Sequence, residues 1–329
     1  MDIKNRKAIK QEAAQALSQD PRTVRQQVLV HCSVLVGFSV LLTVINFFIS
    51  RMVGSADGLE NIGLRNTLET IQTVMGYLNY FAFPIWEMGF VYVLIRHVRG
   101  TVTDNADLTM GFRRIGSVLI VLLLQGLVMS MLAVFCMQMS AVIFMSTPLS
   151  GDFRQLMQPL LEATANGSLN DVSPELMQAA TWETVPLVIV FVALYLGLLA
   201  PLFYRFRLAK YLIMDEERIS AITALTGSWK MMKGHCMDFF KLDLSLWWYY
   251  LVNGLISALL YGNTWLNILN IEPSLAVDTV DLLFYFGYTV CIFLWMLKAK
   301  APVETAYAVA YDRIMSRDQK EITAPGNAE

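Results

Sequence analysis

The stretch VLIVLLLQGLVMSMLAVFCMQMSAVIFM, residues 118–145, decides the fold class of this chain. It runs for 28 residues without a single Asp, Glu, Lys or Arg. A helix needs about 20 apolar residues, at about 1.5 Å of rise per residue, to cross about 30 Å of hydrocarbon. The stretch therefore predicts a membrane-spanning helix.

The composition extends this prediction to the whole chain. Of its 329 residues, 56% are hydrophobic and only 16% are charged, and the mean hydropathy is +0.49. Soluble domains carry about 25% charged residues, so a soluble fold with this composition would leave too much apolar surface in water. We expect an all-α, polytopic membrane protein.

Six segments are long and apolar enough to span a bilayer. We predict a six-span membrane domain at residues 27–312, between a cytoplasmic amphipathic leader at 1–26 and a cytoplasmic tail at 313–329. An extracytoplasmic helical insertion is expected at 147–183, with two short helices around a turn at Asn166 and Gly167. The predicted spans are about 27–52, 71–97, 114–146, 184–212, 239–261 and 280–300.

The basic residues predict the orientation of these spans. If the N-terminus is cytoplasmic, 22 of the 25 Lys and Arg residues fall in cytoplasmic segments, and only Arg51, Arg65 and Arg154 fall outside. Cytoplasmic loops of membrane proteins carry an excess of Lys and Arg. We therefore expect both termini in the cytoplasm and an even number of spans.

Residues 216–235, EERISAITALTGSWKMMKGH, have the pattern of a helix that lies in the cytoplasmic interface of the membrane. Lys230 and Lys233 precede Gly234, which we expect to follow the helix end, because glycine readily adopts the left-handed conformation found there. Basic interfacial helices attract anionic lipid, here that of the inner leaflet, while protein partners stay unknown. Apolar residues recur at steps of three or four, at Ile219, Ile222, Leu225, Trp229 and Met232.

Four segments in one order carry a family resemblance: EMGFVYVLIRHVRG, DLTMGFRRIGSVLIVLLLQ, FYRFRLAKYLIMDE and ISAITALTGSWKMMKGHCMDFFKLDLSLWW. They resemble the bacterial membrane family known as domain of unknown function 975, over about residues 85–255. Its most specific part runs from Ser228 to Ser245, and ETAYAVAYDRIM near the end adds a weaker similarity. The insertion between the third and fourth spans departs from the family pattern, as does Cys236, where a basic residue is common. The resemblance implies an integral protein of the bacterial cell membrane and brings no established activity.

Glu87, in FPIWEMGFVY, is the most informative single residue of the predicted spans. A carboxylate inside a span is energetically expensive, faces the bundle interior or water, and suggests a substrate, ion or proton site. The structural alternative is a protonated or paired carboxylate that only holds the bundle together. Both readings stay open at the level of the sequence.

Asp243 and His235 lie at the inner edge of the predicted fifth span. We expect Asp243 to accept from a basic residue at the same level, with Arg114, Arg207 and Lys210 as the candidates. His235 and Asp238 are separated by one helical turn, so that the carboxylate can orient the imidazole. Lys233, Gly234, His235 and Asp243 together form the predicted inner-edge motif.

Several function classes receive no support from the sequence. Phosphate-binding loops, dinucleotide fingerprints, zinc-protease motifs and nucleophile elbows are all missing, so we expect a protein that is not an enzyme and has no cofactor. The net charge of −2 and the scattered basic residues argue against nucleic-acid binding. No metal site is predicted, because the cysteines Cys32, Cys136, Cys236 and Cys291 fall in separate segments.

Two functional hypotheses follow from these observations. The first is a non-enzymatic membrane protein that organises partners or lipid at the inner membrane face, or assists transport. The second is a transporter of a small solute or ion with a central polar site at Glu87.

Overall fold

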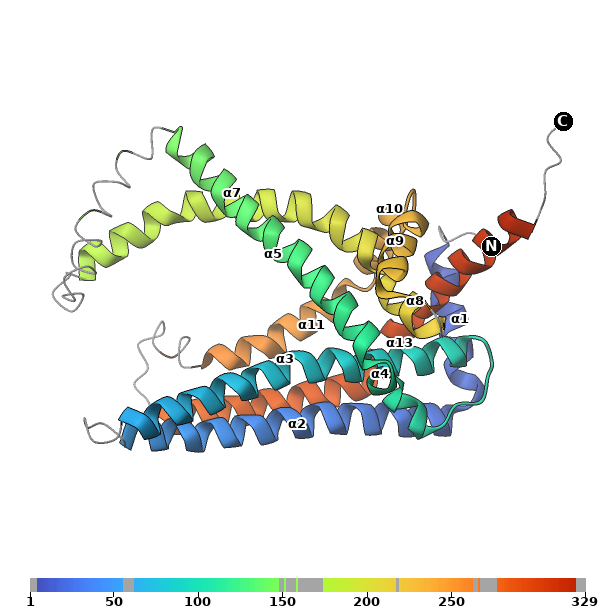
Figure 1. Ribbon diagram of the computed structural model, residues 1–329, viewed down its shortest axis with the longest axis horizontal. Helices are drawn as coiled ribbons and strands as arrows, with labels where there is room; N and C mark the ends of the chain where they lie inside the picture. Colours follow the sequence, from blue (N-terminus) through green and yellow to red (C-terminus); the bar gives the residue numbers. More distant parts are fainter. Residues whose placement is uncertain are drawn as a thin grey trace. The chain divides into compact units, whose positions relative to one another are not determined.

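The computed structural model describes residues 5–55, 62–147, 151, 158, 174–216, 219–262, 266 and 277–323. Every regular element in these ranges is a helix, which confirms the all-α prediction (Figure 1). The chain forms two compact units, one of residues 1–121 with 208–329 and one of residues 122–207.

The first unit contains both ends of the chain and most of the helices. The second unit contains most of α5 (Ile115–Met145) and α7 (Pro174–Phe206). The first unit contains the start of α5 and also α1 (Arg6–Gln19), α2 (Pro21–Ser55), α3 (Ile62–Val98), η2 (Asn105–Thr109), α4 (Met110–Arg113), α8 (Ala209–Asp215), α9 (Ala221–Met231), α10 (Cys236–Ser245), α11 (Trp247–Ser257), η4 (Ala258–Tyr261) and α13 (Val277–Thr323).

Five helical stretches of the described residues are long and apolar enough to cross a membrane. The chain is therefore an all-α polytopic membrane protein. A sixth span is present only if Cys236–Ser245 and Trp247–Tyr261, which meet at an angle of 62°, count as one. The five are Pro21–Ile49, Asn66–Val98, Ile115–Met145, Val185–Asp215 and Val280–Ser316.

The predicted fifth span, 239–261, is thus a broken helix. Leu246 leaves the helical conformation with φ −110° and ψ 17°, so carbonyls beside it lose their helical donors. Two basic residues of α1 reach this region: Lys10 Nζ donates to the carbonyl of Ser245 at 2.7 Å, and Arg6 donates to that of Lys241 at 3.5 Å. Burial lowers the pKa of Lys10, and the nearby charge of Arg6 adds to this effect.

Helix α13 is much longer than the predicted span 280–300 and continues into the predicted tail. Nearly all its side chains between Ala299 and Ile314 are buried, and we call this stretch the core segment of α13. Helices α1, α2, α3 and α11 all contact α13, and Figure 1 shows α2, α3 and α13 running side by side. The core segment therefore lies at the centre of the first unit.

The predicted leader also differs from expectation. Its helix α1 contacts α13, and its apolar residues Ile9, Ala13 and Ala16 are buried. The apolar face of the predicted amphipathic leader thus packs on protein. The next helix, α2, already begins at Pro21, inside the predicted leader 1–26.

The apolar residues predicted for one face of the interfacial helix lie on two sides of α9. Leu225 and Met232 are buried, and α9 contacts α8, whereas Ile222 and Trp229 are exposed. Ser220 begins the helix, because its hydroxyl accepts from the backbone N–H of Thr223 at 3.2 Å. The helix therefore has one face against protein and a second, exposed face that carries aromatic and basic residues.

Most of the predicted insertion at 147–183, including Asn166 and Gly167, lies outside the described residues. From Pro174 the chain is helical and continues into the fourth predicted span as the single helix α7. Proline suits the first turn of a helix because its missing N–H needs no helical partner there.

Two glycines let α3 and the η2–α4 segment approach each other. A Cβ atom on Gly89 would overlap the backbone carbonyl of Leu108, and a Cβ atom on Gly111 would overlap that of Ile85. Backbone atoms cannot move aside as a flexible side chain can. The close crossing of these two segments therefore requires glycine at both positions.

The first prediction tests this crossing. Gly111→Ala is expected to destabilise the protein by about 1–3 kcal/mol or more, because the added methyl group forces two backbones apart. Thermal unfolding in detergent micelles, followed by helical circular dichroism, measures the effect. Gly116→Ala is the matched control, since nothing lies within 4 Å of a Cβ atom there. Equal melting temperatures for the two variants would contradict the packing described.

Candidate functional site

Glu87 lies on α3, and the structure places two basic side chains against one oxygen of its carboxylate. Lys300 Nζ, from α13, donates to Glu87 Oε2 at 2.7 Å. His31 Nε2, from α2, lies 3.3 Å from the same oxygen. We call Glu87, His31 and Lys300 the Glu87 cluster. Three helices that are distant in the sequence therefore meet at one carboxylate.

The Glu87 cluster is largely removed from solvent. The side chain of His31 is fully buried, Lys300 is 8% exposed and Glu87 is 29% exposed. The imidazole of His31 stacks on Phe90 with ring centroids 4.2 Å apart. Among the described residues, neither ring nitrogen of His31 makes a hydrogen bond.

These contacts define what the Glu87 cluster can do chemically. A buried ammonium requires a counter-charge, because the loss of hydration is expensive, and Glu87 supplies one. The pair thereby ties α3 to α13. Histidine can also gain or lose a proton near neutral pH, so the cluster has the groups needed to hold a proton as well as to hold the bundle.

Asp243 has tyrosine partners where the sequence suggested a basic one. Tyr307 of α13 donates a short hydrogen bond to Asp243 Oδ1, and Tyr250 of α11 donates to the same oxygen at 3.4 Å. Of the predicted partners, Lys210 instead donates to Glu304 at 3.1 Å. The tyrosines reach Asp243 because α11, which follows the helix break, packs against α13.

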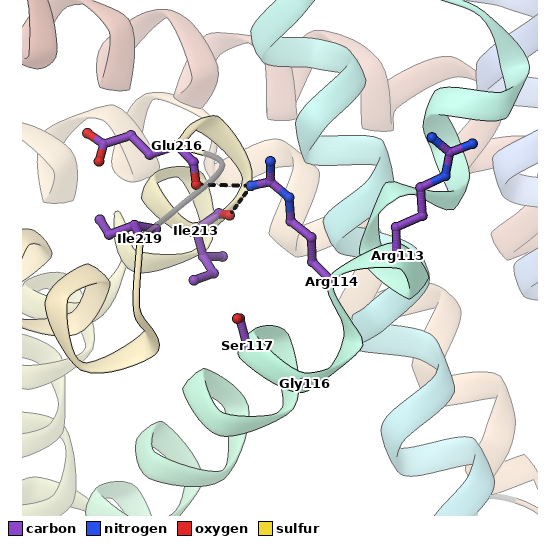
Figure 2. Close-up of a pocket in the computed structure, with 7 residues that line it drawn as sticks. All are labelled: Arg113, Arg114, Gly116, Ser117, Ile213, Glu216 and Ile219. Carbon is purple, nitrogen blue, oxygen red and sulfur yellow. Dashed lines mark hydrogen bonds between the residues drawn. The ribbon is translucent and has the colours of Figure 1, made fainter.

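Arg114, another predicted partner of Asp243, reaches a different group of atoms. Its Nη1 donates to the carbonyls of Ile213 at 2.8 Å and Glu216 at 3.1 Å, and also lies 3.3 Å from that of Met214. Figure 2 shows the side chain extending across a pocket of about 250 Å³ to the carbonyl oxygens of Ile213 and Glu216. Arg114 thus satisfies carbonyls at the C-terminal end of α8, where a cation also complements the helix dipole.

Arg207, the third predicted partner, belongs to the second unit. Its guanidinium lies 5.7 Å from the ring centroid of Phe203 and 5.5 Å from that of Tyr204. These are cation–π distances.

Arg99 forms a second group of ion pairs. Its Nη2 donates to Asp215 Oδ2 at 2.8 Å and its Nε to Asp312 Oδ1 at 2.7 Å. The hydrogen bonds to Asp215 raise the pKa of Arg99 well above its ordinary range. The guanidinium therefore stays charged and neutralises part of the acidic lining of a pocket of about 370 Å³, which Glu216 also lines.

The core segment of α13 supplies one side of most of these contacts. Lys300, Glu304, Tyr307 and Tyr311 follow one another at steps of four, three and four residues, so they share one helical face. Their partners are Glu87 on α3, Lys210 on α8, Asp243 on α10 and, for Tyr311, Asp215 on α8. Arg313 adds an ion pair to Glu12 of α1, with Nε and Oε2 3.1 Å apart.

The remaining residues of the predicted inner-edge motif lie in the turn between α9 and α10. Gly234 has φ 89°, in the left-handed region that glycine favours. Lys233 is exposed. His235 Nδ1 lies 3.6 Å from Asp238 Oδ2, an ion-pair distance too long for a hydrogen bond.

Sequence reasoning missed the partners of Glu87. Lys300 stands at the end of the predicted sixth span beside Lys298, where a lysine is expected to extend toward the membrane surface. His31 stands at the start of the predicted first span. One feature of the sequence could have indicated them: His31 and Lys300, like Glu87, are polar residues within predicted apolar helices.

A family described as "Protein of unknown function (DUF975)" matches the chain over residues 1–318. The chain belongs to the DUF975 family. This confirms the resemblance and extends it well beyond residues 85–255. The DUF975 match includes α1, all three residues of the Glu87 cluster and the core segment of α13. No curated protein and no solved structure matches the chain.

The second prediction tests the pairing within the Glu87 cluster. Lys300→Met is expected to destabilise this DUF975 protein by up to about 3–5 kcal/mol, because the Glu87 carboxylate loses its ammonium partner and keeps only His31 beside it. Adding Glu87→Gln should recover much of that loss, since the double variant no longer carries the partly buried carboxylate. Unfolding in detergent measures the stability of the single and the double variant. Lys298→Met, which removes an exposed lysine two residues away, is the control, and equal losses from Lys298→Met and Lys300→Met would refute the pairing.

Proposed function

We propose that this DUF975 protein is a non-enzymatic protein of the bacterial cytoplasmic membrane that gathers anionic lipid at its cytoplasmic side. The observation that carries this proposal is the set of exposed side chains on α9, α10 and the turn between them. We call this set the α9–α10 surface. It consists of Trp229, Lys230, Lys233, Met237, Phe240, Lys241 and Leu244.

The apolar part of the α9–α10 surface fits a membrane interface. Met237 and Leu244 expose 61% and 58% of their area, and Phe240 exposes 45%. With steps of three and four residues, these three side chains lie on one face of α10. Amphipathic helices with this pattern lie at the boundary between headgroups and acyl chains.

The charged part of the α9–α10 surface favours anionic lipid over neutral lipid. Its exposed charges are the three lysines Lys230, Lys233 and Lys241. The two carboxylates of α10 are less exposed: Asp238 lies beside His235, and Asp243 accepts from tyrosine hydroxyls. Each basic residue near an anionic leaflet contributes about 1 kcal/mol of attraction.

The proposed orientation places this surface in the cytoplasm. With both termini cytoplasmic, 22 of the 25 basic residues fall on that side, the excess typical of cytoplasmic loops. Anionic lipids give the cytoplasmic leaflet a negative surface potential. The anionic lipids and the α9–α10 surface then lie on the same side of the membrane.

The third prediction tests lipid selection at Trp229. The protein is reconstituted in phosphatidylcholine bilayers with a small share of brominated phosphatidylglycerol or, separately, brominated phosphatidylcholine. The Trp229 signal is obtained by difference from Trp229→Phe. We expect stronger quenching by the brominated anionic lipid, and loss of about two thirds or more of that preference in the triple variant Lys230→Gln, Lys233→Gln and Lys241→Gln.

The matched control removes three exposed basic residues elsewhere in the first unit. Lys7→Gln, Arg22→Gln and Arg25→Gln change the net charge equally and should leave the preference at Trp229 intact. Equal quenching by the two brominated lipids in the parent protein would overturn the proposal. So would an equal loss of preference in the two triple variants.

One observation favours a second candidate function, transport through the bundle. The Glu87 carboxylate lies within the candidate span Asn66–Val98 and keeps 29% of its side chain exposed. Intramembrane carboxylates of this kind mark ion and proton pathways in transporters. The two pockets described above are lined by other residues, so this candidate rests on the carboxylate itself.

The fourth prediction separates the two functions. If the protein conducts protons, proteoliposomes that contain a pH-sensitive dye should show a proton flux that Glu87→Gln reduces at least about tenfold. Glu69→Gln, which changes an exposed carboxylate of the same helix, should retain the flux. A flux that is the same with Glu87→Gln, or no flux above empty liposomes, rejects transport of protons and leaves the lipid proposal unaffected.

A further inference from the structure

In the Glu87 cluster two bases share one carboxylate oxygen, an arrangement that neither lipid binding nor a simple ion pair requires. Lys300 Nζ is 2.7 Å from Glu87 Oε2, and His31 Nε2 is 3.3 Å from it. One helix, α3, is thus connected through a single atom to α13 on one side and to α2 on the other.

His31 has a free position for a proton. Nε2 is the ring nitrogen that faces the carboxylate, so a neutral ring with its hydrogen on Nε2 keeps a lone pair on Nδ1 that can accept a proton. Neither ring nitrogen makes a hydrogen bond among the described residues, although Nε2 lies 3.3 Å from Glu87 Oε2, and the side chain is fully buried. The carbonyl of His31 is held separately, because Trp86 Nε1 donates to it at 3.2 Å. The backbone of α2 is therefore anchored next to a ring that can change its charge.

The surroundings of His31 contain few other charges in the described part of the chain. The carboxylate of Glu304, on α13, interacts electrostatically with His31, but it also forms an ion pair with Lys210 of α8. Cys32 lies beside His31 on α2, near Glu87 and Lys300, and Tyr249 of α11 is near Glu87 and Glu304. Thiol and phenol groups are uncharged near neutral pH. The charge of the site is therefore set mainly by Glu87, Lys300 and His31.

Electroneutrality allows two arrangements of the Glu87 cluster. With Lys300 against Glu87 and His31 uncharged, the cluster is neutral. One more proton on His31 gives a net charge of +1 in a mostly apolar setting, which is expensive. Withdrawal of the Lys300 ammonium from the carboxylate restores neutrality between His31 and Glu87. A proton on His31 and the Lys300–Glu87 contact therefore oppose each other.

We propose that the Glu87 cluster is a proton-binding site in which His31 takes up a proton as Lys300 leaves Glu87. The proton is held at Nδ1, while Nε2–H donates to Glu87. The occupancy of this site determines whether α3 is bound more firmly to α13 or to α2. This inference is independent of lipid binding and does not require that protons cross the membrane.

The fifth prediction uses nitrogen NMR of the full-length protein in bilayers of phosphatidylcholine and phosphatidylglycerol. The chain has three histidines, and His97→Gln and His235→Gln assign the remaining signal to His31. We expect a neutral, Nε2-protonated ring at pH 8, and an imidazolium at lower pH that appears together with a shift of the Lys300 Nζ signal. In Lys300→Gln, His31 should already be an imidazolium at pH 7, where the parent protein has the neutral ring.

Matched variants separate charge from packing. Lys300→Arg keeps the cation and should behave like the parent protein, and the combination of Lys300→Gln with Glu87→Gln should return His31 to the neutral form at pH 7. A His31 ring that stays neutral down to pH 4, or that is protonated without any change at Lys300, overturns the proposal. The titration of the parent protein decides this even if Lys300→Gln fails to fold.

Discussion

The burial of Lys300 is the constraint on which the rest of the first unit depends. Lys300 is 8% exposed, its charge is expensive to bury without a counter-ion, and in the structure Glu87 is that counter-ion. This fixes the depth at which α3 lies against α13. The same requirement recurs one turn at a time along the core segment, where Glu304, Tyr307 and Tyr311 each need a polar partner from another helix.

These contacts matter most for the short helices. Helix α1 has 14 residues, α10 has 10 and α8 has 7, and isolated helices shorter than about 12–15 residues are marginal in water. Each of the three is held to α13 by at least one polar contact of the core segment: Arg313 with Glu12, Tyr307 with Asp243 and Glu304 with Lys210. The core segment therefore determines the positions of elements that could not persist alone.

The sequence was sufficient to predict the fold class, because the thickness of the bilayer imposes a local requirement on each span. The pairing between spans is not local: Glu87 and Lys300 are 213 residues apart. Glu87 was recognisable as a site because it stands alone in an apolar run. Lys300 was not, because a lysine near the end of a span is ordinarily expected to reach the surface.

The sequence did not predict the tyrosine partners of Asp243 or the helix break, because both depend on contacts with residues that are remote in the sequence. A carboxylate at the inner edge of a predicted span suggested a cation, but two tyrosine hydroxyls also donate to it. Tyr250 and Tyr307 do not stand out among the 13 tyrosines of this chain. The break at Leu246 lacks the proline or glycine that usually predicts one. Lys10 of α1 and Tyr307 of α13, both remote in the sequence, supply the contacts on either side of it.

The break at Leu246 also explains how α10 can lie along the membrane interface while Trp247–Tyr261 enters the bilayer. Trp247–Tyr261 alone contains 15 residues, which is about 22 Å of helix and short of the roughly 30 Å of hydrocarbon. If both termini are cytoplasmic, as we propose, this segment must still cross the membrane, so part of the distance has to come from α10 or from local thinning of the bilayer. A straight continuation would draw Lys241 and Asp243 toward the hydrocarbon. A bend of 62° at Leu246 lets α10 turn Lys241 and its apolar side chains along the interface instead, and Lys10, by donating to Ser245, compensates the carbonyl that the bend exposes.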